Sequence, residues 1–173
     1  MHIRFSTVFA LSALSATLTL AGPVFAQGTR LSEPAGGFSY TVPAGWQIKT
    51  LPGLKYRVCY AAPSAGFAPN INIVDEVAAM PLDTYVRVSL KMMQKGYTNL
   101  HMVSTTSFPA AAGLVGRRMA ITGSLSGRSV YQVFYFFPAA NNRKIIATAT
   151  WLTKDGTKYV APTNAAMKTF KLQ

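Results

Sequence analysis

The segment SVYQVFYFF, Ser129–Phe137, decides how this chain must fold. In a β-strand, successive side chains point to opposite faces of the sheet. Both faces of this segment are largely apolar, with Val130, Phe134 and Phe136 on one and Tyr131, Val133, Tyr135 and Phe137 on the other. A strand with two apolar faces must be covered on both sides. The segment therefore predicts an interior strand of a sheet that is packed on each face.

The segments on either side of it predict an antiparallel meander. Gly116–Ser124 precedes it and Arg143–Leu152 follows it, and both have the composition of strands. The connections, Gly123–Gly127 and Pro138–Asn142, are of turn length and contain residues that favour tight turns. We therefore expect these three segments to be consecutive antiparallel neighbours.

The first half of the chain also shows the period of two that is typical of strands. Lys55–Ala61 alternates, which predicts an apolar face with Tyr56, Val58 and Tyr60 and a wetter face with Lys55, Arg57 and Cys59. The other predicted strands are Phe38–Lys49, which a turn at Pro43-Ala44-Gly45 divides, Asn70–Ile73 and Thr98–Thr106.

Two segments carry the period of an amphipathic helix. The first begins near Pro81 and ends near Gly96, residue types that suit the two ends of a helix. Its apolar stripe is Leu82, Tyr85, Val86, Leu90 and Met93. A shorter helix is expected after Pro162, with Ala161 outside it because the residue before a proline avoids helical geometry. The stripe of this second helix is Thr163, Ala166, Met167 and Phe170.

Residues 1–26 have the features of a secretory signal peptide. A positive start at Arg4 leads into the apolar run Phe5–Leu20, and Val24-Phe25-Ala26 supplies small residues for cleavage after Ala26. A retained membrane anchor is the alternative, but the run is short for a bilayer. We expect an exported protein, periplasmic or secreted, with no transmembrane anchor after cleavage, a flexible lead-in over 27–37 and a single domain over 38–172.

The composition is strongly basic. The sequence has 17 Lys and Arg against 5 Asp and Glu, and loss of Arg4 with the signal peptide leaves a net charge of about +11. Such a chain is attracted to polyanions. For an exported protein these are an acidic protein, an anionic lipid or an acidic polymer of the envelope, and nucleic acid is not expected. The alternative is that the charge serves solubility alone.

The sequence does not show a recognisable catalytic pattern. His101 is the single histidine after the predicted signal peptide, and neither Cys59 nor the acidic residues have metal-ligand spacing with it. Asp75 and Glu76 are adjacent on a strand and therefore face opposite sides, so we interpret them as solvated charges at a strand end. We expect no catalytic residue, no metal and no cofactor. A small hydrolase that uses Cys59, activated by Lys55 and Arg57, or an unrecognised serine is an alternative.

Positive residues repeat along one side of the first predicted helix. Arg87, Lys91 and Lys95 lie four residues apart, opposite the apolar stripe, and Asp83 is expected to pair with Arg87. We call these three residues the cationic ridge. The ridge and the pair Arg117 and Arg118 are the candidate binding residues, with a merely solvated helix face as the alternative.

Several short motifs follow one another in a fixed order along residues 38–172. They are the Pro-x-Gly-Trp turn at 43–46, the strand Asn70–Ile73, the helix opening at Pro81-Leu82-Asp83, the strand end Ala147–Trp151 and a closing helix with Phe170. This order resembles the Mog1/PsbP-like superfamily, in particular its exported bacterial members. The resemblance implies an α+β fold, an antiparallel sheet of about six or seven strands with helices packed on both faces, as an α/β/α sandwich.

The resemblance also implies a class of function. Members of this superfamily are mostly non-enzymatic accessory or binding proteins, in nuclear transport, photosystem assembly and the bacterial envelope. We therefore expect a non-catalytic accessory protein of the cell envelope that recognises an anionic partner. An exported inhibitor or immunity-type module is the alternative among binding proteins. The metal sites proposed for photosystem members have no matching ligands in this sequence.

Overall fold

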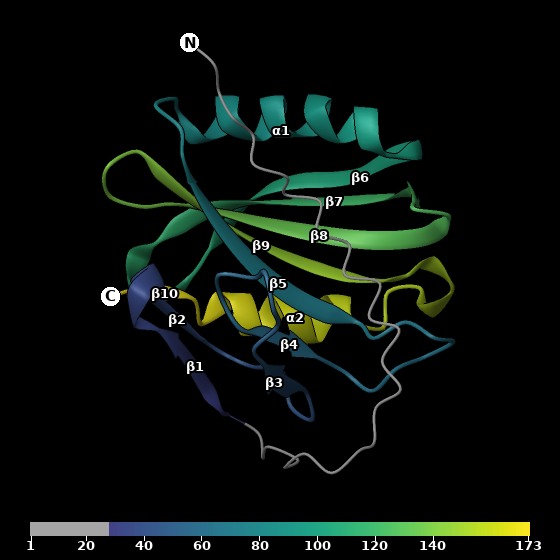
Figure 1. Ribbon diagram of the computed structural model, residues 1–173. Helices are drawn as coiled ribbons and strands as arrows, with labels where there is room; N and C mark the ends of the chain where they lie inside the picture. Colours follow the sequence, from purple (N-terminus) through teal and green to yellow (C-terminus); the bar gives the residue numbers. More distant parts are fainter. Residues whose placement is uncertain (1–27) are drawn as a thin grey trace.

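The computed structural model describes residues 28–173, which are organised around a seven-stranded antiparallel sheet (Figure 1). Its strands, in spatial order, are β3 (Gln47–Lys49), β4 (Val58–Tyr60), β5 (Asn70–Val77), β9 (Arg143–Leu152), β8 (Arg128–Pro138), β7 (Val115–Leu125) and β6 (Thr98–Pro109). A smaller sheet has the order β1 (Arg30–Glu33), β2 (Phe38–Thr41) and β10 (Lys171–Leu172). The predicted signal peptide lies outside the described residues.

The helices connect and cover these sheets. They are α1 (Leu82–Gly96) and α2 (Val160–Lys168), with short 3-10 turns at η1 (Pro34–Gly36), η2 (Ala111–Gly113) and η3 (Thr153–Asp155). Within residues 28–173, no helix is both long enough and apolar enough to cross a membrane.

Strand β8 is the interior strand that its two apolar faces predict. It pairs antiparallel with β7 on one side and β9 on the other, so the expected meander is confirmed. Its alternate residues enter two separate hydrophobic clusters: Val133, Tyr135 and Phe137 in one, and Val130, Phe134 and Phe136 in the other. Each of these six side chains is at most 2% exposed, so burial on both faces is confirmed.

Helix α1 covers one face of the sheet. It occupies the segment that the 3.6-residue period predicts, with Pro81 at its N-cap. Tyr85 and Met93 are buried in the same cluster as Phe134 and Phe136. The ring of Tyr85 meets that of Phe136 edge to face, with their centroids 6.0 Å apart.

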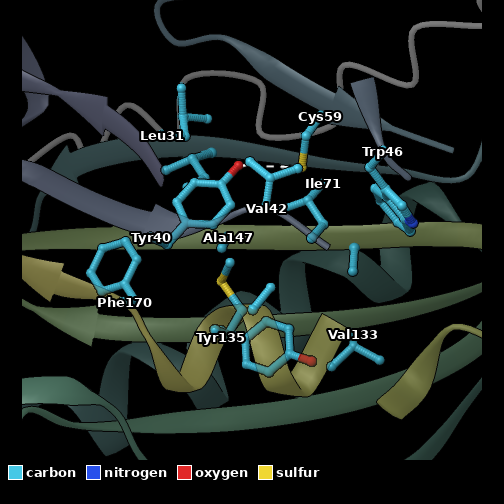
Figure 2. Packing of buried hydrophobic residues seen from close by; sticks show 14 of the residues in the cluster. Leu31, Tyr40, Val42, Trp46, Cys59, Ile71, Val133, Tyr135, Ala147 and Phe170 are labelled. Atoms are coloured by element: carbon cyan, nitrogen blue, oxygen red, sulfur yellow. Dashed lines mark hydrogen bonds between the residues drawn. The ribbon is translucent and has the colours of Figure 1, made fainter. Parts of the chain in front are cut away.

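The opposite face is covered by more than a helix. Leu31 and Tyr40 of the small sheet and Met167 of α2 share a cluster with Tyr135 of β8 (Figure 2). Phe170, just after α2, stacks on Phe137 with ring centroids 4.3 Å apart. The α+β class and the antiparallel sheet are therefore confirmed. The sandwich with helices on both faces is not confirmed in that form, because the small sheet supplies much of this second layer.

Three local expectations are wrong. Ala161 lies inside α2, which starts at Val160. Pro162 is tolerated there because amide groups in the first helical turn lack partners within the helix. The predicted strand Lys55–Ala61 is reduced to the three residues of β4. The expected flexible lead-in instead contains β1 and η1, because Leu31 is buried and Gln173 donates its backbone N–H to the carbonyl of Gly37 at 2.9 Å.

The turn before Trp46 is a structural corner, as its sequence indicates. The backbone N–H of Trp46 donates to the carbonyl of Pro43 at 3.1 Å, and Gly45 has a φ of +76°, which favours glycine. Trp46 is buried and packs edge-on against Tyr159. The role of this corner is therefore structural: it holds Trp46 at the edge of the core.

Candidate binding surface

The cationic ridge lies on the solvent side of α1. Arg87, Lys91 and Lys95 are all exposed, while the opposite side of the helix is buried on the sheet. None of the ion pairs in the described chain includes a ridge residue. Arg87 instead donates to the hydroxyl of Thr84 at 3.1 Å. Residues four apart on a helix are neighbours on one side, so the three charges form a continuous row.

The expected pair between Asp83 and Arg87 is wrong. Asp83 is paired with Arg117 of β7, whose Nε and Nη2 donate to the two carboxylate oxygens at 2.5 Å and 3.0 Å. A guanidinium group matches a carboxylate in this two-bond geometry, and Arg117 rather than Arg87 adopts it here. The hydrogen bond from Arg117 lowers the pKa of Asp83. The first turn of α1 is thus tied to β7, and the ridge is left without a paired acid.

Arg117 and Arg118 do not form one patch. Neighbouring residues of a strand point to opposite faces, and Arg118 lies on the side of α2, where its Nε donates to Asn164 at 3.0 Å. Its Nη1 donates to the hydroxyl of Ser104 on β6 at 3.1 Å. Of the five candidate residues, Arg117 therefore lies on the face of the sheet that α1 covers. Arg118 lies on the opposite face, apart from the ridge.

Acidic residues on β5 are engaged by partners, so their interpretation as solvated charges is wrong. Asp75 accepts hydrogen bonds from Lys55 at 2.7 Å and Tyr56 at 3.0 Å, and its side chain is only 8% exposed. Burial alone would raise the pKa of Asp75, but these hydrogen bonds outweigh it and the pKa is lowered. Glu76 accepts a hydrogen bond from Tyr85. These acids therefore do not neutralise the ridge.

Cys59 lies on a buried face, contrary to the expected wetter one. It is fully buried beneath the small sheet, 3.4 Å from the hydroxyl of Tyr40 (Figure 2). Burial raises the pKa of the thiol to about 12. The pattern misleads because the neighbours Val58 and Tyr60 are buried as well, so β4 has no wet face. A buried, protonated thiol does not fit the role of a nucleophile.

His101 is far from Cys59. It is exposed on β6, and β4 and β6 are five strand spacings apart in the large sheet, about 24 Å at the usual inter-strand distance. The two residues therefore cannot act as a nucleophile and base in this fold. Within residues 28–173, no three His, Cys, Asp or Glu side chains gather in a way that could hold a metal ion.

Sequence reasoning missed the exposure of β6. This strand ends the large sheet, and Met102 and Val103 are each 53% exposed on its two faces. Its composition, rich in Ser and Thr and without regular apolar alternation, is the signal that could have indicated this. The ridge, on the side of α1 that faces away from the sheet, and the open strand β6 are therefore two separate exposed features.

The chain resembles several solved structures. No family model matches it, and no similar sequence is found among curated proteins. The solution structure of cyanobacterial PsbP (CyanoP) from Synechocystis sp. PCC 6803 matches with a TM-score of 0.58 and 11% identity, over 91% of this chain and 99% of that chain. LpqN of Mycobacterium tuberculosis matches with a TM-score of 0.61 and 11% identity, over 84% and 85%.

The chain has the Mog1/PsbP-like fold. A protein of unknown function from Pseudomonas aeruginosa, PA94, is also similar, with a TM-score of 0.54 and 16% identity over 85% of this chain and 98% of that one. The resemblance that the sequence motifs indicate is thus confirmed for the fold. LpqN is described as involved in cell envelope biogenesis. A shared fold at such low identity does not carry function with it.

Proposed function

We propose that this chain is an exported, non-catalytic accessory protein of the cell envelope that binds an anionic partner through the cationic ridge. The observation that carries the proposal is the row of Arg87, Lys91 and Lys95, exposed along α1 and free of ion pairs within the described residues. The Mog1/PsbP-like fold and the envelope role of LpqN support this class of function. The buried Cys59 disfavours the hydrolase alternative.

The physical basis of binding is electrostatic attraction at close range. After cleavage the chain carries about eleven surplus positive charges, and the ridge presents three of them in one row. Exposed charges of this kind raise the rate of encounter and select the sign of the partner more than they add affinity. Binding should weaken with salt, because the Debye length falls from about 10 Å at 0.1 M to about 3 Å at 1 M.

The test compares two variants with equal net charge. The ridge variant carries Arg87→Glu, Lys91→Glu and Lys95→Glu. The control variant carries Lys49→Glu, Lys154→Glu and Lys168→Glu, three exposed lysines on other elements. Co-sedimentation with phosphatidylglycerol vesicles, lipopolysaccharide micelles and polyglutamate-coated beads measures binding at about 0.1 M salt.

We expect the ridge variant to lose at least one of these interactions while the control variant keeps it. Equal loss in both variants would show that only the total charge matters, and would refute a localised site. Circular dichroism on both variants checks that the fold is intact, which we expect because all six substituted side chains are exposed.

A further inference from the structure

The edges of the two sheets differ in length and charge. Within the described residues the edge strands are β1, β3, β10 and β6, and the first three have only four, three and two residues, each with at least one charged side chain. Strand β6 has twelve residues and contains no Lys, Arg, Asp or Glu. Short length and charged side chains are common means by which proteins keep an edge strand from pairing with another chain. Strand β6 has neither of them.

Only the second half of β6 offers a regular edge. The register of β6 with β7 shifts twice between Thr98 and Ser104, and such bulges hinder further pairing. Over residues 104–108 the register is continuous, and Pro109 ends this run because its nitrogen carries no hydrogen. On the side away from β7, no strand of the described chain pairs with the run (Figure 1). Alternate backbone N–H and C=O groups of the run therefore point outward without a strand partner.

The regular part of β6 also projects beyond the layers that cover the sheet. Thr105, Thr106 and Ser107 are consecutive, so their side chains alternate between the two faces, and all three are exposed. Neither α1 on one face nor α2 and the small sheet on the other therefore extends over this stretch. Another strand can approach it in the plane of the sheet without meeting a covering element of the described chain.

Exposed apolar side chains lie at both ends of the regular part. Met102 and Val103, each 53% exposed, come just before it, and Val115, 52% exposed, lies on β7 opposite Pro109 at its other end. An antiparallel partner with the same sequence brings the start of one run beside the end of the other. These apolar side chains would then approach each other across the contact, which favours association because it removes apolar surface from water.

The regular part is complementary to itself. Two strands related by a two-fold axis keep the same residues on each face, so the axis passes between a residue and its own copy. An axis at Thr105 pairs Ser104 with Thr106, and an axis at Thr106 pairs Thr105 with Ser107. In either register the central pairs consist of hydroxyl side chains. A hydroxyl both donates and accepts, so identical residues can satisfy each other, and Thr–Thr and Thr–Ser pairs stabilise antiparallel strands.

The absence of charge favours a second copy over a foreign partner. In a symmetric contact, a charged residue near the axis lies close to the same charge of the other copy, which is destabilising. The sequence has 17 Lys and Arg, yet none of them lies on β6. The cations on the neighbouring strand β7 are engaged within their own chain, Arg117 by Asp83 and Arg118 by Asn164. A contact with a foreign partner has no such requirement.

We propose that two copies of the exported chain associate by antiparallel pairing of residues 104–108 of β6 with the same residues of the second copy, about a two-fold axis at Thr105 or Thr106. The two large sheets become continuous across this contact. The inference is independent of the proposed function, because the cationic ridge lies on the side of α1 that faces away from the sheet. Few residues pair and each copy carries a charge of about +11, so the dimer is weak and strengthens as salt screens the repulsion.

Sedimentation velocity of the exported chain without its signal peptide tests the association, from about 10 μM to about 1 mM protein and at about 0.1 M and about 1 M salt. The Lys variant carries Thr105→Lys and Thr106→Lys, which places like charges beside the axis in either register. The Glu variant carries Thr105→Glu and Thr106→Glu. The control variant carries Thr50→Lys and Thr157→Lys, two exposed residues away from β6, and has the same net charge as the Lys variant.

We expect the wild-type chain and the control variant to form dimers whose fraction rises with protein and with salt. The Lys and Glu variants should each associate at least about tenfold more weakly, and an equimolar mixture of the two should recover dimers, because opposite charges then face each other. Wild-type monomers under every condition would overturn the proposal and leave the edge to a partner other than a second copy. A dimer that the Lys variant keeps in full would place the contact on another surface and overturn it equally.

Amide hydrogen exchange of the wild-type chain gives a second readout that needs no substitution. The outward N–H groups within residues 104–108 are open to water in the monomer and paired in the dimer. We expect their exchange to slow in the concentrated chain while exchange in α1 is unchanged. Equal exchange of residues 104–108 in dilute and concentrated samples, where sedimentation shows monomers in the first and dimers in the second, would overturn the pairing of β6.

Discussion

Replacing Phe134 by Ala tests the two-sided core most directly. Phe134 is 2% exposed and lies on the α1 side of β8, with its ring 6.1 Å from that of Phe136. Truncation of a buried Phe to Ala costs about 3–5 kcal/mol, since it removes apolar contacts and leaves a cavity that the neighbours fill only in part. For a domain of this size each kcal/mol lowers the unfolding temperature by about 2–4 °C. We therefore expect a fall of about 6–20 °C.

Urea unfolding followed by circular dichroism measures the loss in free energy of unfolding, and thermal unfolding measures the fall in unfolding temperature. The matched variant is Phe137→Ala, because Phe137 is fully buried on the opposite face, against Phe170. We expect a similar loss from each, with an unchanged dependence on urea concentration. Val103→Ala, at a half-exposed position of β6, should cost less than about 1 kcal/mol. If Phe134→Ala were as mild as Val103→Ala, the claim that α1 covers this face would be refuted.

Three further outcomes are expected. Cys59 should not react with iodoacetamide at about pH 8 in the folded protein but should react in urea, because burial raises its pKa to about 12; rapid labelling of the folded chain would contradict this placement. The depressed pKa of Asp75 means that its carboxylate stabilises the fold at neutral pH and loses that contribution as the pH falls below about 4. The urea midpoint of the wild-type chain should fall between neutral and acidic solution, and Asp75→Asn should make this fall smaller. An unchanged fall would argue against a stabilising contribution of the Asp75 carboxylate. Mass spectrometry of exported protein should find Gln27 at its N-terminus, whereas an intact Met1 would contradict cleavage.

Periodic segments were predictable because their own residues determine their structure. The stripe of α1 and the double apolar face of β8 each require one type of element, and the short turns of the meander leave a single simple pairing. The Mog1/PsbP-like fold could therefore be anticipated from the order of these elements. The small sheet could not be anticipated, because β1, β2 and β10 have only two to four residues each and β10 reaches β2 from the other end of the chain.

The candidate site was predictable only in part, for a related reason. Exposure of Arg87, Lys91 and Lys95 follows from the stripe on the other side of the same helix. The partner of Asp83 cannot be predicted from the helix alone, because the packing of α1 on the sheet, which brings Arg117 beneath the helix, is a long-range property. The burial of Cys59 likewise depends on Tyr40, which arrives from a different sheet. Local patterns assign faces to an element, but they do not show what covers each face.

The position of β6 follows from the connection that precedes it. Strand β5 pairs with β9, the last strand of the meander, so the chain must cross β9, β8 and β7 before it can add β6 at the far edge. Helix α1 makes that crossing and packs on the sheet as it does so, which leaves its outer side in solvent directly above the last strands. The topology therefore places α1 above the last strands of the sheet, with the cationic ridge on the side of the helix that faces away from them.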